Sequence, residues 1–465
     1  MMQITMKPIK DKAGPVGTGM CRMAGLYRKV PNGPGKYGRK GLIGTLLLAL
    51  VLAVCTAPSR AEAMELPERY DAREAGRTSP ARDQGAWGSC WAFASLLAIE
   101  NSLLPQEAWD FSEDHMLHNP NFNFREEVGG DYMMAAAYLL AWQGPVTEAE
   151  DAYGDGVSPE GLKPSKHVQE VKVLPEGDRD AIKRAVMETG GVQTSLYTTM
   201  TDQTSESEFY NLEAKAYCYP HETDPNHDVV IVGWDDNFPR EAFSAEVEGN
   251  GAYLCENSWG TLFGDQGFFY VSYYDKNIGK TNAVYSKVEP ADNYDFIYQS
   301  DLCGWIGQLG YGEEAAWGAN VYTAAGAENL KAAGFYAVDK NTDYEVYIAR
   351  HLNGKEGSSG FYSREQVARG HLEYAGFYTI TFDREIPLDP GERFAVIIRL
   401  KTPGALHPIA IEFDAGDGRG NVNAKDGEGY LSYEGKDWVH VENKQNCNVC
   451  LKAYTKARPA QEGEQ

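Results

Sequence analysis

The chain has 465 residues, with 43 lysines and arginines against 67 aspartates and glutamates, and its formal net charge is −24. Residues 1–63 hold ten basic and two acidic side chains, so the rest of the chain carries −32. So acidic a surface repels phosphate backbones and anionic membranes, which excludes non-specific nucleic-acid binding. Hydrophobic residues make up 43% of the chain, enough for a large core, and the length predicts two or three domains.

The first 63 residues predict an export signal. Basic side chains precede the apolar run 42–54, and Ala61-Glu62-Ala63 is a small-x-small cleavage pattern. Thirteen apolar residues are short for a permanent membrane span, which needs about 20. Lipid attachment at Cys55 is a second, less favoured option, because bulky Val54 precedes it. We therefore expect cleavage after Ala63 and an extracellular, periplasmic or cell-surface location, with little chain left before Leu66 for an inhibitory pro-segment.

Six cysteines follow the predicted signal. An exported protein meets an oxidising environment, where pairs of cysteines can form disulfides. Cys218 with Cys255, and Cys447 with Cys450 or Cys303, are candidate pairs between which the sequence does not decide. The spacing of Cys447 and Cys450 also occurs in redox and zinc sites, but no second C-x-x-C accompanies it, so we expect no metal there.

Helices are expected in the first half of the mature chain. Ser89 is a plausible N-cap for a helix with apolar residues at i, i+3 and i+4, which ends before Pro105. Further helices are predicted near 131–142 and 178–189. From Val229 the pattern changes to strands, at 229–232 and 267–274. Helices followed by strands predict an α+β domain that ends near residue 288.

Beyond that point, helical periodicity nearly disappears. Short runs of β-branched and aromatic residues alternate with glycine, aspartate, asparagine and proline clusters, a pattern typical of a β-sandwich or jelly roll. The expected strands are 333–338, 344–349, 376–382, 393–400, 409–413, 429–433 and 450–454. We therefore predict domains at 64–288 and 289–458, followed by a polar tail at 459–465.

The strongest chemical motif surrounds Cys90 and reads Gln84-Gly85-Ala86-Trp87-Gly88-Ser89-Cys90-Trp91-Ala92-Phe93. Cys90 falls in the first turn of the predicted helix, where the helix dipole and free backbone N–H groups lower the pKa of a thiol. A thiolate nucleophile needs a histidine to protonate the leaving amine. His227 stands out among the nine histidines because it directly precedes a buried-type strand.

Asn257 lies thirty residues after His227, in Glu256-Asn257-Ser258-Trp259-Gly260. Its amide oxygen could accept the imidazole N–H, and Trp259 could shield that bond from water. The side chain of Gln84 could donate to a tetrahedral oxyanion together with the backbone N–H of Cys90. These residues predict a Cys-His-Asn site that needs no metal or cofactor.

With these motifs the sequence resembles the papain-like cysteine peptidases, from Leu66-Pro67-Glu68-Arg69-Tyr70-Asp71 to Gly267-Phe268-Phe269-Tyr270-Val271. The resemblance implies a two-lobed α+β peptidase fold, with Cys90 as nucleophile, His227 as acid and base, Asn257 as orienting residue and Gln84 as oxyanion donor. Gly129 and Gly130 match a glycine pair that hydrogen-bonds extended substrates. The strand-rich remainder is similar to the lectin-like domain of some bacterial secreted peptidases.

Two departures from the family pattern bear on function. Trp87 occupies the position of a disulfide cysteine, so that bridge is absent. Asp228 replaces a small residue that borders the pocket for the substrate residue two before the cut. We hypothesise that Asp228 admits lysine or arginine there, whereas a carboxylate turned to solvent or paired elsewhere is an equal alternative. Gly129, Gly130, Asp228 and Trp259 are the residues expected to bind substrate.

The sequence therefore predicts an exported cysteine endopeptidase that acts on proteins or peptides through an acyl-enzyme. One alternative is a surface binding or adhesion protein that uses the peptidase fold as a scaffold. Another is a thiol amidase or transpeptidase acting on cell-wall peptides. By resemblance alone, the C-terminal domain is expected to bind a glycan or cell-surface ligand.

Overall fold

The structure is a computed structural model that describes residues 3–6, 65–118, 121–123, 129–352, 360–416 and 420–459. The predicted export signal lies outside these residues except for β1 (Gln3–Met6), which pairs antiparallel with β12 (Gly307–Gly310). No helix in the described part of the chain is long and apolar enough to cross a membrane.

The predicted helices are present, although the hydroxyl of Ser89, at the N-cap position of the first, makes no capping hydrogen bond. Ser89 precedes α1 (Cys90–Leu103), which is buried from its first residue to Asn101 and ends before Pro105. The carboxylates of Asp131 and Asp178 accept backbone N–H groups at the starts of two further helices. The remaining helices are α2 (Glu113–Leu117), α3 (Tyr132–Leu140), α4 (Arg179–Thr189) and α5 (Val441–Gln445), with short 3₁₀ turns at Arg240–Ala242 and Phe361–Ser363.

The N-terminal half, residues 65–290, is built on strands that follow and interleave with these helices. The predicted strands at 229–232 and 267–274 are confirmed as β7 and β9. The pattern of the remaining strands was not predicted, because several are short or carry charged residues. The strands are β2 (Arg69–Asp71), β3 (Lys166–Leu174), β4 (Val192–Leu196), β5 (Tyr210–Asn211), β6 (Ala216–Tyr217), β7 (His227–Asp235), β8 (Ala252–Glu256), β9 (Phe268–Ser272) and β10 (Asn282–Pro290).

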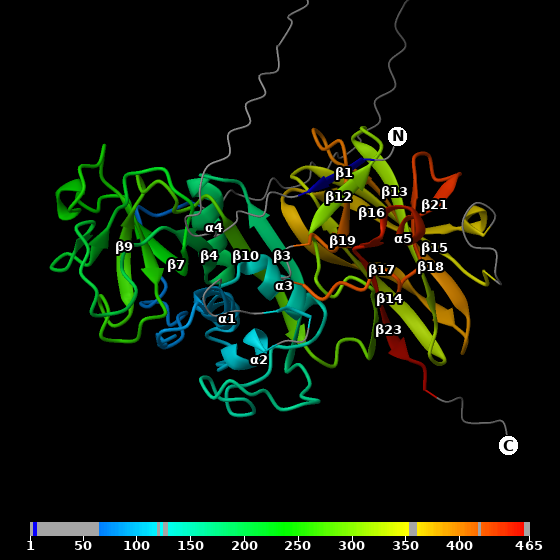
Figure 1. Cartoon of the computed structure of the whole chain (residues 1–465), viewed down its shortest axis with the longest axis horizontal. Coiled ribbons are helices and arrows are strands. Elements are labelled where there is room, and N and C mark those ends of the chain that lie inside the picture. Colours follow the sequence, from blue (N-terminus) through cyan, green and yellow to red (C-terminus); the bar gives the residue numbers. More distant parts are fainter. Residues whose placement is uncertain are drawn as a thin grey trace, which may run out of the picture. The chain divides into compact units, whose positions relative to one another are not determined.

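The C-terminal half is all-β apart from α5 and confirms the predicted sandwich. A six-stranded sheet, in the order β16-β15-β18-β13-β20-β21, faces β14, β17 and β23 across a shared apolar core (Figure 1). The strands of the C-terminal half are β11 (Phe296–Tyr298), β12, β13 (Ala315–Thr323), β14 (Glu328–Ala337), β15 (Thr342–Ala349), β16 (Glu365–Leu372), β17 (Ala375–Leu388), β18 (Arg393–Lys401), β19 (Ile409–Phe413), β20 (Gly429–Ser432), β21 (Trp438–His440), β22 (Cys447–Val449) and β23 (Leu451–Ala457).

One sheet runs through both halves of the chain. Within the described residues it continues in the order β11-β23-β14-β17-β3-β10-β4-β7-β8-β9-β6-β5. The junction is the antiparallel pair of β3 and β17, in which Val173 opposes Ala375 and Val171 opposes Phe377. β10, at the predicted boundary between the domains, continues to Pro290. The strand that carries His227 therefore belongs to the same sheet as the C-terminal half.

The candidate disulfides are wrong. None of Cys218, Cys255, Cys303, Cys447 and Cys450 forms a disulfide in the structure. Burial raises the pKa of Cys218, Cys303 and Cys447 to about 12, which removes their thiolate character at neutral pH. These buried cysteines pack as small apolar side chains.

A buried ion pair fixes β23 in the C-terminal core. The Lys452 ammonium lies 2.8 Å from an Asp301 carboxylate oxygen and donates to Gln299 Oε1 at 2.7 Å, and the two charged side chains are only 1% and 0% exposed. Removing one partner of such a pair leaves a buried charge uncompensated, which typically costs about 3–5 kcal/mol.

We therefore expect Lys452→Met to lower the free energy of unfolding by about 3–5 kcal/mol in urea denaturation. Lys436→Met is the matched control, because Lys436 forms an exposed pair with Glu434 at 3.4 Å and should matter little. Equal effects of the two substitutions would contradict the importance of the buried pair.

Candidate active site

His227 and Asn257 form a buried hydrogen-bonded pair. His227 is the first residue of β7, and its Nε2 lies 2.7 Å from Asn257 Oδ1. The same amide oxygen accepts the backbone N–H of Ser258 at 2.8 Å, which identifies it as the oxygen. Because an amide oxygen only accepts, Nε2 carries the proton, and the imidazole is held in one tautomer.

The ring of Trp259 covers this pair. It stacks on the imidazole of His227 with ring centroids 4.7 Å apart and an interplanar angle of 28°. Trp259 is itself buried, and Phe263 packs edge-on against its other side. The structure thus places Trp259 as a shield for the His227–Asn257 bond. Its predicted contact with substrate stays a prediction.

Gln84 is tied to the same segment through Ser258. The backbone N–H of Gln84 donates to Ser258 O at 2.8 Å, and the Ser258 hydroxyl donates to Gln84 Oε1 at 2.6 Å. The Gln84 amide nitrogen in turn donates to Trp87 O at 2.8 Å. The Gln84 amide thus accepts one hydrogen bond through Oε1 and donates one through Nε2, and the two bonds fix its orientation. The second N–H of Nε2 is left for another acceptor.

Cys90 is the first residue of α1, and the residue before it is linked to Gln84. The Ser89 hydroxyl lies 2.8 Å from the Tyr153 hydroxyl, which donates to Gln84 O at 2.8 Å. Helix α1 packs against β7, the strand that begins with His227. The chain thereby places a thiol at the N-terminus of a helix that packs against the strand beginning with the oriented imidazole.

Gly129 and Gly130 precede α3 in a segment that tolerates no side chains. Gly129 has a φ of +67°, a left-handed conformation that favours glycine. A Cβ on Gly130 would lie 2.5 Å from Cε2 of Trp91, the residue after Cys90. The backbone here can therefore lie close to the start of α1, as the expected substrate-binding role requires.

Asp228 is buried and hydrogen-bonded by neutral groups of the neighbouring strand β4. Its carboxylate accepts from Gln193 Nε2 at 3.0 Å and from the Ser195 hydroxyl at 2.7 Å. The Asp228 charge also acts on Tyr132, at the start of α3. Burial raises the pKa of Tyr132 most, and the negative charges of Asp131 and Asp228 raise it further. The carboxylate is thus held in place between β4 and the segment that follows the two glycines, and its neutral donors add no positive charge.

Sequence reasoning missed the residues that connect the site. Ser258 could have been suspected, since it stands inside the Asn-Ser-Trp segment that carries Asn257. Its hydrogen bond to Gln84, however, spans 174 positions and has no local sequence signal. Tyr153 and Gln193 had none, because a tyrosine in a loop and a glutamine in a strand are ordinary. Trp87 stands where the family pattern has a disulfide cysteine, and its side chain packs there instead. Its ring meets the ring of Tyr153 edge-on, with ring centroids 5.6 Å apart.

Comparison with known families agrees with this geometry. Residues 66–288 match the family described as papain family cysteine protease, and residues 297–455 match the one described as lectin like domain. Residues 66–288 therefore form a papain-family cysteine protease domain, and residues 297–455 form a lectin-like domain. The fold class and the family resemblance predicted from the motifs are confirmed.

Solved structures with both domains are similar to this chain. The cysteine protease and lectin-like domains of Cwp84, a surface layer associated protein of Clostridium difficile, match with a TM-score of 0.75 and 25% identity, over 84% of this chain and 89% of that one. The clostridial protease after propeptide cleavage matches with a TM-score of 0.73, again at 25% identity, over 84% of this chain and 99% of that one.

Curated relatives match the peptidase half. Cathepsin S of Mus musculus is 29% identical over 232 residues, which are 46% of this chain and 60% of the relative. Cysteine proteinase 2 of Entamoeba histolytica is 26% identical over 216 residues, 44% of this chain and 63% of the relative. The chain thus spans about three fifths of the length of these relatives.

Glu256, the residue before Asn257, is a buried carboxyl group. Its Oε2 accepts from Asn101 Nδ2 of α1 at 2.9 Å, while Oε1 has no hydrogen-bond partner. Burial raises its pKa from the usual 4.5 to about 8, so the folded protein holds this proton at neutral pH. The unfolded chain releases the proton near pH 4.5, so the stability of the fold falls as pH rises from about 4.5 to about 8.

We expect Glu256→Gln to flatten the pH dependence of stability. Glutamine keeps the acceptor for Asn101 and cannot ionise, so it should remove up to about 1.4 kcal/mol of stability loss per pH unit in that range. Urea denaturation at several pH values would measure the slope, with the exposed Glu248→Gln as control. An unchanged slope in Glu256→Gln would show that Glu256 is ionised in the folded protein.

Proposed function

We propose that this chain is an exported cysteine endopeptidase with Cys90 as its nucleophile. The observation that carries the proposal is the oriented His227–Asn257 pair, joined through Ser258 to Gln84 and set against the helix that begins with Cys90. The papain-family match of the same residues supports it.

In the proposed reaction, the Cys90 thiolate attacks the carbonyl carbon of a peptide bond. The oxyanion accepts hydrogen bonds from the free N–H of the Gln84 amide and from the backbone N–H of Cys90, at the helix N-terminus. His227, which has taken the proton of Cys90, gives it to the leaving amine as the C–N bond breaks and the acyl-enzyme forms. It then takes a proton from the water that attacks the acyl carbon, and the C–S bond breaks to release the acid product and Cys90. The Asn257 bond keeps the imidazole oriented through both steps.

Export and surface binding belong to the same proposal. The similar clostridial protease is described as surface layer associated and also pairs a cysteine protease with a lectin-like domain. A lectin-like domain of this kind would bind carbohydrate and so localise the peptidase at a cell surface. Protein or peptide chains are the proposed substrates.

Labelling with an epoxysuccinyl thiol-protease inhibitor tests the nucleophile. Mass mapping should find the adduct on Cys90, and casein cleavage should stop. Cys255 is the internal control, because it is buried and its thiol pKa is raised well above the ordinary value by burial. Cys90→Ala should take up no label and leave casein intact. Folded, reduced wild-type protein that neither labels at Cys90 nor cuts casein would overturn the proposal.

Cleavage of Arg-Arg and Phe-Arg reporter peptides tests the proposed role of Asp228. If its carboxylate faces a basic side chain two residues before the cut, Asp228→Ala should lower the ratio of kcat/KM values for Arg-Arg over Phe-Arg by about tenfold, the effect of one favourable charge contact of about 1.4 kcal/mol. Asp235→Ala, at the other end of β7, is the control. A ratio unchanged by Asp228→Ala would show that this carboxylate does not contact the basic side chain of the substrate.

A further inference from the structure

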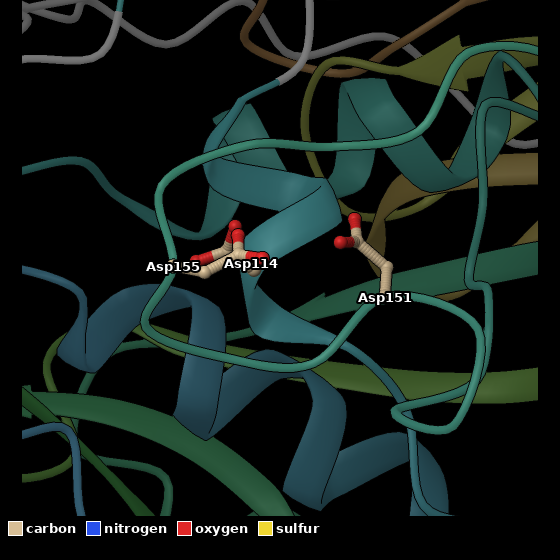
Figure 2. A group of neighbouring side chains, drawn as sticks. All are labelled: Asp114, Asp151 and Asp155. Carbon is tan, nitrogen blue, oxygen red and sulfur yellow. The ribbon is translucent and has the colours of Figure 1, made fainter.

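Three aspartates converge in the peptidase domain away from the proposed catalytic residues. Asp114 lies on α2, while Asp151 and Asp155 lie in the loop between α3 and β3. One carboxylate oxygen from each lies within 4.8 Å of the other two. Figure 2 shows the Asp151 carboxylate directed toward the side where Asp114 and Asp155 meet. The three charges therefore share one small space.

Two of these carboxylates hold oxygens that the protein does not satisfy. Asp151 is 3% exposed, and its Oδ2 is buried without a hydrogen-bond partner. Asp114 is fully buried, and its Oδ2 also has no hydrogen bond, although His118 Nδ1 lies 3.2 Å away. Buried carboxylate oxygens are normally hydrogen-bonded or bound to a metal. Buried carboxylate oxygens without hydrogen-bond partners, in a group of three neighbouring carboxylates, indicate a cation-binding site.

The other oxygens of the cluster are already used by the backbone. Asp114 Oδ1 accepts the N–H of Gly154 at 3.1 Å, and Asp155 Oδ1 accepts that of Val157 at 2.9 Å. These bonds fix two carboxylates in position. Among the described residues, no lysine or arginine forms an ion pair with any of the three aspartates, and His118 is the one histidine that pairs with them, through Asp114 Oδ2 at 3.2 Å.

We propose that Asp114, Asp151 and Asp155 bind a calcium ion. Oxygen-only ligands are typical of hard cations, and Ca²⁺–O distances of about 2.3–2.6 Å allow two ligands of one ion to lie up to about 5 Å apart. The limit of 4.8 Å among these oxygens fits that geometry. Magnesium usually keeps several waters and is bound through one or two carboxylates, so a group of three protein carboxylates suits it less well than calcium. The exposed side of Asp155 gives the ion access to water.

The ion would stabilise the loop that supports the proposed active site. Tyr153 stands between Asp151 and Asp155, and its hydroxyl bonds Gln84 O and Ser89 Oγ. Calcium would thus fix both sides of the residue that holds the start of α1 to Gln84. This consequence for activity rests on the proposed peptidase function, whereas the binding of the ion does not.

Thermal denaturation of the chelator-treated full chain tests the site. Calcium should raise Tm by about 3 °C at a concentration a hundredfold above its dissociation constant, and magnesium should raise it far less. Asp151→Asn and Asp155→Asn should each abolish the rise. Asp224→Asn, in an exposed loop, is the matched control and should keep it. Asp155 is exposed, so its substitution should leave folding intact even if that of buried Asp151 does not.

Three results would overturn the proposal. The first is a wild-type Tm unchanged by about 10 mM calcium, a concentration above the weak extracellular range of dissociation constants. The second is a calcium-induced rise in Tm that survives in both variants. The third is an equal rise in Tm with magnesium. Terbium luminescence excited through tyrosine and tryptophan gives a second readout, expected in wild type and lost in Asp155→Asn.

Peptide hydrolysis separates this proposal from the proposed function. If both hold, calcium removal should lower kcat in wild type, and Asp155→Asn should have the same low kcat with or without calcium. A calcium-dependent Tm in a protein that cuts no peptide would support the ion site and contradict the peptidase function. Full activity in the chelator, together with a calcium-dependent Tm, would support the site and contradict its coupling to Tyr153.

Discussion

The hydrogen bond between His227 Nε2 and Asn257 Oδ1 is the constraint on which the proposed chemistry depends. It sets which imidazole nitrogen carries the proton, and it holds only because Asn257 cannot turn over. The backbone N–H of Ser258 keeps the amide oxygen in place, and the Ser258 hydroxyl fixes the amide of Gln84. The segment 257–258 thus orients the side chains of His227 and Gln84, which come from distant parts of the sequence. A change that displaces either side chain would therefore disturb the other as well.

A buried charge network positions the chain around this segment. The Arg82 guanidinium pairs with Glu100 of α1 and Glu113 of α2, each at 3.0 Å or less, just before Gln84 in sequence. Burial raises the pKa of Glu113 to about 8 despite the nearby guanidinium, which shows how strongly the interior disfavours a further charge. A buried network of this kind adds little net stability but specifies one arrangement of the loop and the two helices.

The sequence was most informative where local signals and chemistry coincide. The serine before α1, the apolar period of that helix and the β-branched residues near the start of β7 are local signals. They correctly predicted a helix at Cys90 and a strand at His227. Contacts that join distant segments left no local trace. The pairing of β3 with β17 unites residues 171 and 377, and the hydroxyl of Tyr153 meets Gln84 across 69 positions. The disulfides were expected from compartment alone, and packing places the thiols elsewhere.

The shared sheet makes the lectin-like domain a structural part of the peptidase. Strand β3 pairs with β17 on one side and β10 on the other, and β10 leads through β4 to β7, which begins with His227. Without β17, the N–H and C=O groups on one side of β3 would face solvent as an open sheet edge. The antiparallel ladder satisfies them and fixes the register of β3 with β10 beside it. The C-terminal domain therefore supports the frame of the proposed active site, with three strands between β17 and β7, in addition to any ligand that it binds.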